Sequence, residues 1–329
     1  MASAPRAFVL AAGLGTRLRP LTDTWPKPAI PFLGATLLRR TLAVLARAGV
    51  DRMALNTHHL PGVMERVARD EGARRGLAVT TVHEPVIQGT GGGLRGLQRA
   101  LPGDDVVVAW NGDILFAPDL GPLLAEHRAS GAAATMLLLP MPPGRSYGVV
   151  EIDAGGRVRR IGRPGPAPLP GCTAWHFSGV HLLSPRVFEA MAPEGPEDIN
   201  HDVYPRLFGE GGVRGVVVDA PWSDLGSPAS YLEAQSDLLL GRVPDPLGTE
   251  SPLAGRTEAG PLVEPGARVH PDADLAPDVF VAAGVEVPAG VRVTRTALLT
   301  GARIEPAETV AEEIRWLGQR LSAPGFSRP

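Results

Sequence analysis

A six-residue repeat near the end of the chain constrains its fold more than any other feature. Apolar residues recur every six positions in two interleaved registers, one at Val263, Val269, Leu275, Val281, Val287, Val293 and Leu299, the other at Ala267, Ala273, Val279, Val285, Val291 and Ala297. This period is typical of a parallel β-helix, in which each repeat supplies one face of a triangular coil. At about 18 residues per coil, residues 262–304 are predicted to make little more than two coils.

A β-helix this short needs support, because each coil of a solenoid buries its apolar face only against a neighbour. We expect it to lean on the rest of the chain or on a second copy of the chain, as a homo-oligomer. Residues 305–329 are predicted to form a helical tail, whose amphipathic part at 309–321 would cap the β-helix. Residues 241–261 are rich in proline, glycine and threonine and are predicted to be a linker.

Residues 1–240 alternate short apolar runs with amphipathic segments. The predicted strands are 7–12, 52–57, 78–83, 105–110 and 133–139, and the predicted helices are 37–48, 61–75, 92–101 and 118–129. This alternation indicates an α/β domain with a doubly wound, mostly parallel, Rossmann-like sheet. Ligands of such sheets bind beyond the carboxyl ends of the strands, so the site is expected in the segments after the first, fourth and fifth strands.

A later part of the same domain is predicted to be rich in strands. Strands at 147–152, 157–161 and 173–183 would form a β-rich insertion between residues 146 and 183. Helices are predicted to follow near 185–191, 203–208 and 228–240, so the domain is expected to end at about residue 240.

Composition excludes several classes of function. The net charge is -3, from 32 basic and 35 acidic residues, so no basic surface for nucleic acid is expected. No run reaches the ~20 apolar residues of a membrane span, and the short apolar run at 7–12 is predicted to be a buried strand rather than a signal peptide. The single cysteine, Cys172, excludes an internal disulfide and fits a reducing compartment. We expect a cytoplasmic protein without a nucleic-acid or membrane partner.

Lysine occurs once, at Lys27, beside 31 arginines. A coding bias that replaces lysine with arginine wherever either residue suffices explains this imbalance. Under such a bias, the remaining lysine marks a position where a planar guanidinium cannot replace a compact ammonium, unless it survives by chance. Lys27 is therefore a candidate functional residue before any motif is considered.

The segment after the first strand combines glycines with cations. Gly13, Gly15 and Arg17 lie in Leu10–Thr22, and Trp25-Pro26-Lys27-Pro28 follows. Glycines let backbone N–H groups approach a phosphate, Arg17 adds a fork that matches phosphate oxygens, and Lys27 adds a point charge on a proline-stiffened loop. The alternative is a tight strand-to-helix turn. A dinucleotide fingerprint is excluded by the missing third glycine, and a P-loop by the missing Gly-Lys-Ser/Thr.

These residues closely resemble the signature of the sugar-1-phosphate nucleotidyltransferases, from residue 6 to about 240. The repeat after them is similar to the left-handed β-helix of members such as mannose-1-phosphate guanylyltransferases. The resemblance implies that Arg17 and Lys27 are catalytic and grip the nucleotide phosphates during transfer. The nucleotide-binding residues that it implies are Leu10, Ala11, Ala12, Gly13, Gly15, Thr16, Glu84, Gln88, Gly89, Thr90, Gly91 and Asn111.

The glycine-rich segment 88–93 resembles the part of the family that lies along the nucleobase. Its Thr-Gly-Gly-Gly form is similar to that of N-acetylmuramate-1-phosphate uridylyltransferases, where glycines permit backbone contact with the base. Without the resemblance, a flexible helix-entry loop explains the same glycines equally well.

Two aspartates are expected to bind magnesium. Asp113 follows the most apolar strand of the chain, where a carboxylate suits Mg²⁺, an ion that takes few protein ligands. The segment Trp222–Gly226 resembles the family's second metal-holding segment, so the resemblance implies Asp113 and Asp224 as a magnesium pair. A helix cap or a turn is the alternative explanation for either aspartate alone.

One segment departs from the family pattern. Family members usually carry Glu-Lys-Pro at the sugar and its phosphate, whereas this chain has Gly162-Arg163-Pro164. Arg163 can still bind a phosphate, but Gly162 has no side chain to contact a sugar hydroxyl. Phe177-Ser178-Gly179-Val180 resembles the sugar-facing strand of the muramate uridylyltransferases, so altered sugar choice is favoured over lost activity. The implied sugar-phosphate-binding residues are Gly148, Arg163, Ser178 and Gly179.

The implied reaction transfers a nucleotidyl group from an NTP to a sugar 1-phosphate, with Mg²⁺, giving an NDP-sugar and pyrophosphate. The expected substrates are a hexose or amino-sugar 1-phosphate and either UTP or GTP, and the expected use is cell-envelope polysaccharide synthesis. The β-helix favours guanylyl transfer, whereas Thr-Gly-Gly-Gly and Phe-Ser-Gly favour uridylyl transfer. The alternative is a non-catalytic regulatory homologue that binds a nucleotide sugar and controls a partner enzyme; Gly162-Arg163 is its only support.

Overall fold

The computed structural model describes residues 4–142, 147–163 and 167–323. The chain divides into two compact units. Unit 1 comprises Met1–Gly13, Leu42–Gly112 and Pro118–Ala220, and unit 2 comprises Leu14–Thr41, Asp113–Ala117 and Pro221–Pro329. This division differs from the predicted one, which placed residues 1–240 in a single domain. The chain changes unit at Gly13–Leu14 and at Gly112–Asp113, inside two of the predicted site segments.

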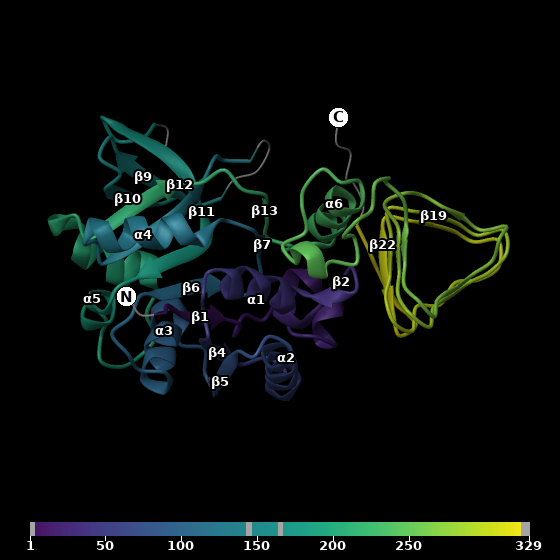
Figure 1. Ribbon diagram of the computed structural model, residues 1–329, viewed down its shortest axis with the longest axis horizontal. Helices are drawn as coiled ribbons and strands as arrows, with labels where there is room; N and C mark the ends of the chain where they lie inside the picture. Colours follow the sequence, from purple (N-terminus) through teal and green to yellow (C-terminus); the bar gives the residue numbers. More distant parts are fainter. Residues whose placement is uncertain (1–3, 143–146, 164–166, 324–329) are drawn as a thin grey trace. The chain divides into compact units, whose positions relative to one another are not determined.

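Unit 1 is built on a nine-stranded sheet (Figure 1). Its parallel part has the order β6-β1-β4-β5, with β6 (Val107–Asn111), β1 (Arg6–Leu10), β4 (Arg52–Thr57) and β5 (Ala78–His83). β1 and β6 are buried along nearly their whole length, as near-continuous apolar sequence predicts for central strands. The predicted strands at 52–57 and 78–83 are confirmed with the same bounds.

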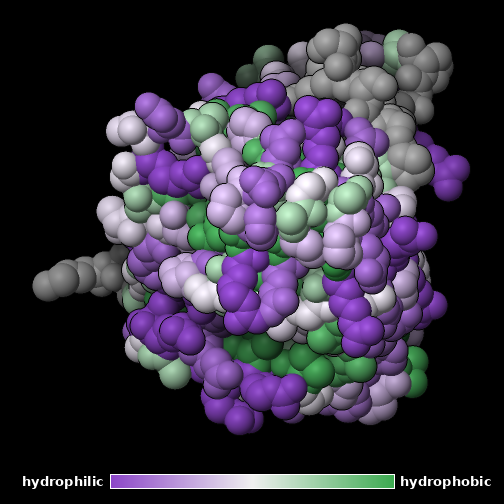
Figure 2. Space-filling view, turned by 90° about the vertical axis from the view of Figure 1, so that its right-hand side faces the viewer, coloured by the Kyte–Doolittle hydropathy of each residue, from purple (hydrophilic) through white to green (hydrophobic). Residues whose placement is uncertain are grey.

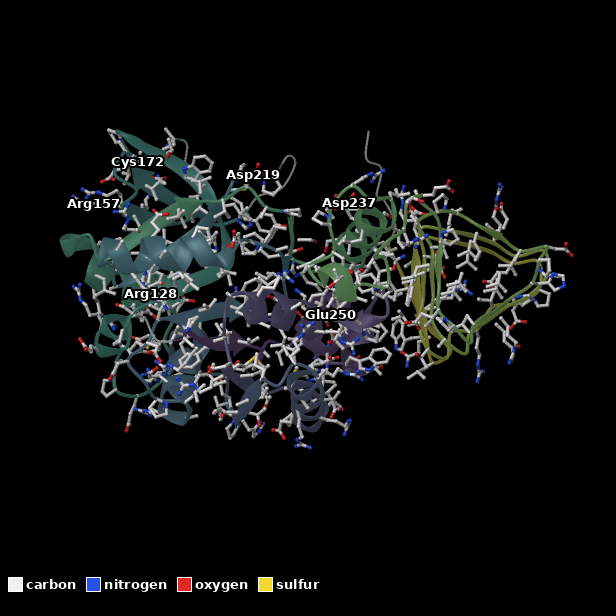
Figure 3. All side chains as sticks on the ribbon, viewed as in Figure 1. Arg128, Arg157, Cys172, Asp219, Asp237 and Glu250 are labelled. Carbon is white, nitrogen blue, oxygen red and sulfur yellow. The ribbon has the colours of Figure 1, made fainter. Side chains whose placement is uncertain are left out.

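The remaining strands of this sheet make it mixed. β11 (Cys172–Leu183) runs antiparallel to β6, β8 (Ala134–Leu139) and β9 (Val149–Asp153), and β9 pairs with β10 (Val158–Gly162). Cys172, labelled in Figure 3, starts β11 and is partly exposed. These strands confirm the β-rich insertion and, with the helices between the other strands, the α/β fold class.

One strand of the sheet is not predicted by the sequence pattern. β12 (Val213–Val217) pairs in parallel with β8 at the edge of unit 1's sheet. Its central residue is Gly215, and a Cβ there would lie 2.4 Å from Cδ1 of Leu138. The packing therefore requires a glycine, and that glycine breaks the short apolar run by which a strand is detected.

The helices of unit 1 follow the predictions with one exception. They are α2 (Pro61–Ala73), α3 (Gly89–Ala100), α4 (Leu120–Ser130) and α5 (Pro185–Glu189), while α1 (Leu37–Arg47) begins in unit 2. The predicted helix at 203–208 is instead a π-helical turn, η4 (Ile199–Val203), followed by a 3-10 helix, η5 (Tyr204–Glu210). In the described parts of the chain, no helix is both long enough and apolar enough to cross a membrane.

The C-terminal part of unit 2 is a parallel β-helix, as the six-residue repeat predicts. The first coil consists of β14 (Leu262–Val263), β15 (Arg268–Val269) and β16 (Asp274–Leu275), and the second of β17 (Phe280–Val281), β18 (Glu286–Val287) and β19 (Arg292–Thr294). Each strand pairs in parallel with its counterpart in the next coil, so that Leu262 lies beside Phe280. Figure 1 shows the triangular outline of the coils.

The helical tail predicted at 305–329 is wrong over the described residues 305–323. β20 (Ala297–Leu298), β21 (Thr309–Ala311) and β22 (Glu313–Trp316) continue the coils, and β23 (Gln319–Ser322) pairs antiparallel with β22. The register runs from Phe280 to Ala297 and on to Ile314, so these coils are one residue shorter than the first. That slip interrupts the six-residue period and hides the later strands, so the β-helix extends beyond residue 304, where the predicted stretch of little more than two coils ended.

The outer surface of the β-helix is polar. Arg292 Nε lies 2.9 Å from Asp274 Oδ2, and Arg268 forms an ion pair with Glu286, in each case between successive coils. Figure 2, which looks onto this side of the molecule, shows a mainly hydrophilic surface with smaller hydrophobic areas between the polar groups. The apolar residues of the repeat are therefore free to fill the interior.

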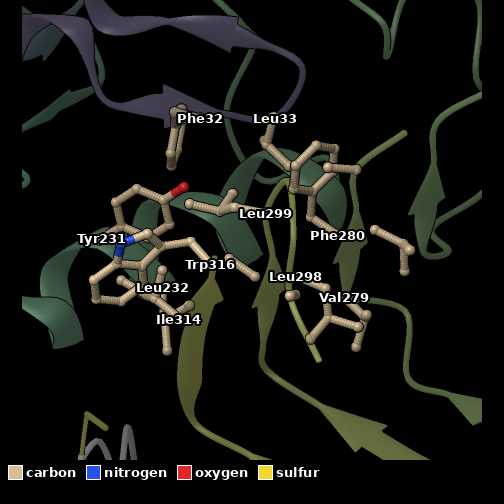
Figure 4. Packing of buried hydrophobic residues seen from close by; sticks show 14 of the residues in the cluster. Phe32, Leu33, Tyr231, Leu232, Val279, Phe280, Leu298, Leu299, Ile314 and Trp316 are labelled. Carbon is tan, nitrogen blue, oxygen red and sulfur yellow. The ribbon is translucent and has the colours of Figure 1, made fainter. Parts of the chain in front are cut away.

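The β-helix leans on the rest of unit 2 through a shared apolar core (Figure 4). The core contains Phe32 of the hairpin formed by β2 (Pro31–Phe32) and β3 (Ala35–Thr36), Tyr231 of α6 (Pro228–Leu239), and Phe280 and Trp316 of the β-helix. Tyr231 donates from its hydroxyl to the carbonyl of Pro31 at 2.6 Å, and its ring meets that of Phe32 edge to face. This packing supports the expectation that the short β-helix is stabilised by the rest of the chain.

Residues 241–261 are anchored rather than a free linker. They contain a short 3-10 helix, η6 (Gly248–Glu250), and Asp245, which forms a buried two-point ion pair with Arg40 at 2.9 and 3.0 Å. Arg40 also donates to the carbonyl of Phe32 at 2.7 Å. Because removal of one partner would leave a buried charge uncompensated, this pair ties the segment firmly to unit 2.

Candidate active site

The two cations predicted to bind phosphate lie in a segment of unit 2 that forms three short 3-10 turns. These turns are η1 (Thr16–Leu18), η2 (Leu21–Asp23) and η3 (Lys27–Ala29), and we call residues 14–29 the Lys27 loop. Gly15 has φ +62°, and a Cβ there would lie 2.8 Å from Cγ2 of Thr22, so this turn requires glycine. Thr22 is buried, and its hydroxyl donates to the carbonyl of Gly15 at 3.0 Å. The loop is therefore packed and stiff, with Thr16 and Arg17 exposed on it.

Lys27 lies at the centre of a group of charged side chains. Its Nζ donates to Oδ2 of Asp113 at 2.9 Å and to the backbone carbonyl of Asp224 at 2.7 Å, and only 7% of the side chain is exposed. The guanidinium of Arg17, 68% exposed, lies 3.9 Å from Oδ2 of Asp224. We call these four residues the charged cluster. It brings together both predicted catalytic cations and both predicted magnesium ligands, all within unit 2.

Two short strands place the aspartates of the charged cluster. β7 (Leu115–Phe116) and β13 (Trp222–Ser223) pair antiparallel, with Ser223 opposite Leu115. Asp113 precedes β7 by two residues and Asp224 directly follows β13, so the pairing joins segments far apart in the sequence. The N–H of Gly226 donates to Oδ1 of Asp224 at 3.1 Å and fixes that carboxylate.

The chemistry of these two carboxylates suits magnesium. Mg²⁺ binds oxygen and uses one or two protein carboxylates together with phosphate and water oxygens. Asp113 is 45% exposed and Asp224 is 16% exposed, so both carboxylates can still reach a ligand from solvent. Among the residues that the structure describes, no group of three His, Cys, Asp or Glu side chains could hold a metal. The two carboxylates therefore suit an ion that takes its remaining oxygen ligands from a phosphate and from water.

A second cluster, in unit 1, consists of polar groups that satisfy one another. Asn56, 3% exposed, accepts from the N–H of Ala11 at 2.7 Å and donates to Oε1 of Glu84 at 2.8 Å. Glu84, 6% exposed, accepts in addition from the N–H of Gln88 at 3.1 Å. We call Asn56 and Glu84, with these backbone groups, the amide–carboxylate cluster. It fixes the end of β1 relative to the start of α3, where the nucleotide-binding residues are predicted.

Asn56 contacts two of the predicted nucleotide-binding residues, Ala11 and Glu84, and the sequence interpretation misses it. Leu10, at the end of β1, lies beside Asn56 of β4 and Asn111 of β6, so the two asparagines flank the same strand end. Asparagine is rare in this chain, and both residues stand at or near the carboxyl end of a predicted strand. That combination is the signal that could have identified Asn56.

The glycine-rich start of α3 has a structural function in unit 1. The N–H groups of Gly91 and Gly92 donate to the carbonyl of Glu197 at 2.8 and 3.2 Å, and a Cβ on Gly89 would lie 2.6 Å from that oxygen. Thr90 donates to Asp198 at 3.1 Å, and its hydroxyl accepts from the N–H of Ile199. These contacts explain the glycines by close backbone packing, whereas contact with a base remains a prediction.

Two of the predicted sugar-phosphate-binding residues, Ser178 and Gly179, lie at an irregularity in β11. The pairing of β11 with β8 shifts register between Phe177 and His181, and Gly179 has φ +91°. A Cβ on Gly179 would lie 3.0 Å from Nδ2 of Asn111, so only glycine lets Asn111 lie this close. Ser178 is fully buried, and its hydroxyl accepts from the N–H of Val180 at 3.2 Å. The serine therefore shapes the bulge rather than presenting a hydroxyl to solvent.

The other two predicted sugar-phosphate residues lie at one end of the β9–β10 hairpin. Gly148 precedes β9 and Arg163 follows β10, and both are exposed. Val149 pairs with Gly162, which brings residues 148 and 163 to the same end of the hairpin. Pro164, the last residue of the altered Glu-Lys-Pro segment, lies outside the described residues.

A model of the nucleotidyl transferase family matches residues 6–240, more than half of the chain. The chain belongs to the nucleotidyl transferase family. The matched range includes every residue of the charged cluster and of the amide–carboxylate cluster, and it ends before the β-helix.

Two relatives show how wide this nucleotidyl transferase family is. The chain is 34% identical over 243 residues to a mannose-1-phosphate guanylyltransferase of Mycobacterium tuberculosis, a match that covers 73% of this chain and 66% of that protein. It is 33% identical over 243 residues to a UTP–glucose-1-phosphate uridylyltransferase of Synechocystis, covering 70% of this chain and 62% of that protein. The matches thus span slightly less than two thirds of the length of these relatives.

A solved structure supports the fold of this nucleotidyl transferase. A crystal structure described as a putative glucose-1-phosphate thymidylyltransferase from Bacillus anthracis, in complex with a sucrose, superposes with a TM-score of 0.60. It is 22% identical in sequence, and the superposition covers 70% of this chain and 94% of the other. At that identity the likeness concerns the fold alone.

Proposed function

We propose that this nucleotidyl transferase transfers a nucleotidyl group from an NTP to a sugar 1-phosphate, forming an NDP-sugar and pyrophosphate. The charged cluster is the observation that carries the proposal. It places a buried ammonium, an exposed guanidinium and two carboxylates together, which suits a reaction between two phosphate anions.

The proposed reaction is an in-line displacement at phosphorus. An oxygen of the sugar phosphate forms a bond to the α-phosphorus of the NTP, while the bond from that phosphorus to the oxygen bridging to the β-phosphate breaks and pyrophosphate leaves. The attacking phosphate is already an anion, so no protein base has to remove a proton. Lys27 and Arg17 then act by neutralising charge on the transition state and on the leaving pyrophosphate.

Asp113 and Asp224 would hold Mg²⁺ in this reaction. When bound, the ion supplies Lewis-acid stabilisation of the phosphate charge. The protein's own contribution is to keep the two carboxylates in place, through the β7–β13 pairing and the N–H of Gly226. Lys27 completes the arrangement, because its ammonium is held by Asp113 and by the carbonyl of Asp224.

We assign nucleotide binding to the residues that the family resemblance implies. The end of β1 and the start of α3 support this assignment, because Asn56 and Glu84 hold backbone groups there in fixed positions. The assigned residues are Leu10, Ala11, Ala12, Gly13, Gly15, Thr16, Glu84, Gln88, Gly89, Thr90, Gly91 and Asn111.

We assign sugar-phosphate binding to Gly148, Arg163, Ser178 and Gly179. The exposed Arg163 would contact the phosphate by its charge, while buried Ser178 and Gly179 would shape the site through the bulge in β11. The relatives named above act on mannose and glucose 1-phosphates with GTP and UTP, according to their names, which supports a hexose or amino-sugar 1-phosphate and either nucleotide. We place the reaction in the cytoplasm, without nucleic-acid or membrane partners, in the supply of cell-envelope polysaccharide precursors.

A screen of purified protein with four NTPs and several sugar 1-phosphates, with Mg²⁺ and measurement of pyrophosphate release, tests the proposal. We expect release with at least one pair that contains UTP or GTP, and its loss when Mg²⁺ is chelated. Release with no pair would favour the second candidate, a non-catalytic homologue that binds a nucleotide sugar and controls a partner enzyme. The altered segment at Gly162-Arg163 is the observation behind that candidate, and the complete charged cluster is the observation against it.

A further inference from the structure

We propose that Trp316 of the β-helix is a positioning residue for the reaction, because it fixes the Lys27 loop through Thr24. This inference rests on the proposed function for its kinetic consequence, but not for its structural one. Trp316 and Thr24 both belong to unit 2 and are separated by most of the chain. The β-helix thereby becomes part of the catalytic machinery's support rather than an appended module.

The contact is a hydrogen bond from the β-helix to the Lys27 loop. Nε1 of Trp316 donates to Oγ1 of Thr24 at 3.2 Å. Trp316 is fully buried in the core of unit 2, so its N–H depends on a protein partner in place of water. The bond is therefore expected to fix the position of Thr24, and with it the Lys27 loop, relative to the apolar core of unit 2.

Trp316 is itself held rigidly by the later coils of the β-helix. It ends β22, whose residues Ile314 and Arg315 pair with Ala297 and Leu298 of β20, and it lies opposite Gln319 of β23. Figure 4 shows its indole among buried side chains of α6 and of the β-helix. The position of its N–H is thus set by the solenoid and not by the loop.

Thr24 transmits this position to Lys27 over a short, stiff stretch. Thr24 directly follows η2 and caps it, with its N–H donating to the carbonyl of Leu21 at 3.1 Å, and Pro26 precedes η3, which begins at Lys27. Pro26 fixes one of the backbone torsions between Thr24 and Lys27, and Pro28 restricts the backbone of Lys27 itself. A displacement at Thr24 must then move the ammonium relative to Asp113 and to the carbonyl of Asp224, both of which contact it at less than 3 Å.

The expected kinetic effect follows from this geometry. A catalytic charge displaced by a fraction of an ångström stabilises the transition state less, while substrate binding by other residues continues. Trp316→Phe keeps an aromatic ring in the core but removes the N–H together with part of the indole, and we expect kcat to fall about 10-fold with each KM within about twofold. Thr24→Val, which removes the acceptor, should give the same result, and Thr24→Ser should restore wild-type kcat.

A double-mutant cycle separates positioning from general loosening of the core. If the two residues act through one hydrogen bond, the double variant should lose no more kcat than either single variant. Phe280→Leu is the matched control, because Phe280 is buried in the same core but takes no part in the contact with Thr24. We expect it to lower the melting temperature at least as much as Trp316→Phe, with kcat within twofold of wild type. Losses of kcat that merely follow the melting temperature would overturn the proposal.

The single lysine provides a test that needs no substrate. Full-length protein labelled with ¹⁵N-lysine shows one backbone amide signal, that of Lys27. We expect Trp316→Phe and Thr24→Val to shift this signal, and Phe280→Leu to leave it in place. A signal unmoved by both variants would overturn the inference. If the signal moves although no NTP and sugar 1-phosphate pair reacts, the positioning stands and the proposed function fails.

Discussion

The charged cluster of unit 2 and the amide–carboxylate cluster of unit 1 are built on opposite principles. In the charged cluster, Arg17 and Asp113 are substantially exposed and only Lys27 is buried, so ions from solvent can exchange partners with its side chains. In the amide–carboxylate cluster, Asn56 and Glu84 are both buried and hold backbone N–H groups. The first arrangement suits groups that respond to changing charge, and the second suits groups that must not move.

Under the proposed function, this difference predicts two kinds of effect on the reaction. Substitution of Arg17 or Asp113 should reduce kcat far more than the free energy of unfolding, because both side chains are substantially exposed and exposed ion pairs contribute little stability. Substitution in the amide–carboxylate cluster should weaken nucleotide binding and the fold together, because buried polar groups lose their partners.

The largest effect is expected from Asp113→Asn. The substitution keeps the shape of the side chain but removes a proposed magnesium ligand and the counter-charge of Lys27. We expect kcat for pyrophosphate release to fall about 1000-fold, which corresponds to about 4 kcal/mol of transition-state stabilisation. The melting temperature should change by only a few degrees. A loss smaller than tenfold would remove Asp113 from the catalytic centre.

A smaller and different effect is expected from Asn56→Ala. The N–H of Ala11 and the carboxylate of Glu84 would lose a buried partner, so the free energy of unfolding should fall by about 3 kcal/mol. The KM for the NTP should rise about 10-fold, with kcat reduced less. Urea unfolding and steady-state kinetics measure the two quantities. Unchanged stability with an unchanged KM would show that the cluster does not support the nucleotide-binding segments.

The two units should also differ in their response to acid. In unit 1, burial lowers the pKa of His181 to about 3 and that of His127 to about 4. Both are neutral in the folded protein, whereas the unfolded chain binds protons below the usual histidine pKa of about 6.5. Stability is therefore complete above pH 6.5 and should fall by about 2 kcal/mol per histidine between pH 6.5 and pH 5.

Unit 2 should keep its stability to lower pH. Hydrogen bonds from Arg315 lower the pKa of Glu308, against the opposing effect of burial, so that contribution is lost only as the pH falls below the ordinary carboxyl range. Urea unfolding at pH 7 and pH 5 measures this difference: the Lys27 amide signal follows unit 2 alone, whereas tryptophan fluorescence follows both units, since both contain tryptophan. In His181→Gln, which retains a polar partner for Tyr204, the acid-induced loss should be roughly half as large. Equal stability at both pH values would contradict the assignment of two neutral buried histidines.

The smallest effect is expected from Arg163→Lys. Arg163 is exposed at the end of the β9–β10 hairpin, where a point charge serves a phosphate about as well as a fork. The KM for the sugar 1-phosphate should change less than twofold, whereas Arg163→Ala should raise it about fivefold. A large effect of the lysine variant would show that the site needs two-point recognition by the guanidinium.

Local patterns account for the parts of the structure that the sequence predicts. The buried central strands β1 and β6 follow from their short apolar runs, and the β-helix follows from its period. The members of the charged cluster are predicted from motifs. The structure adds the reason that its two aspartates lie close together, which is the pairing of β7 with β13.

Features that depend on distant contacts escape prediction from the sequence. β12 contains Gly215 because Leu138 passes close to it, and the 17-residue coils end the visible period before β21 and β22. The ion pair of Arg40 with Asp245, which turns a predicted linker into an anchored segment, joins residues about 200 positions apart. None of these long-range contacts produces a periodic pattern in the local sequence from which it could be predicted.

Lys27→Arg tests most directly whether the charged cluster is the catalytic centre. The ammonium is buried and contacts two oxygens at less than 3 Å, so a larger planar guanidinium should not fit without displacing one of them. With the NTP and sugar 1-phosphate that react, we expect kcat to fall at least about 100-fold while the melting temperature changes little. The reverse exchange at an exposed position of α2, Arg69→Lys, should leave kcat unchanged. A Lys27→Arg variant with kcat within threefold of wild type would contradict the catalytic role of this lysine.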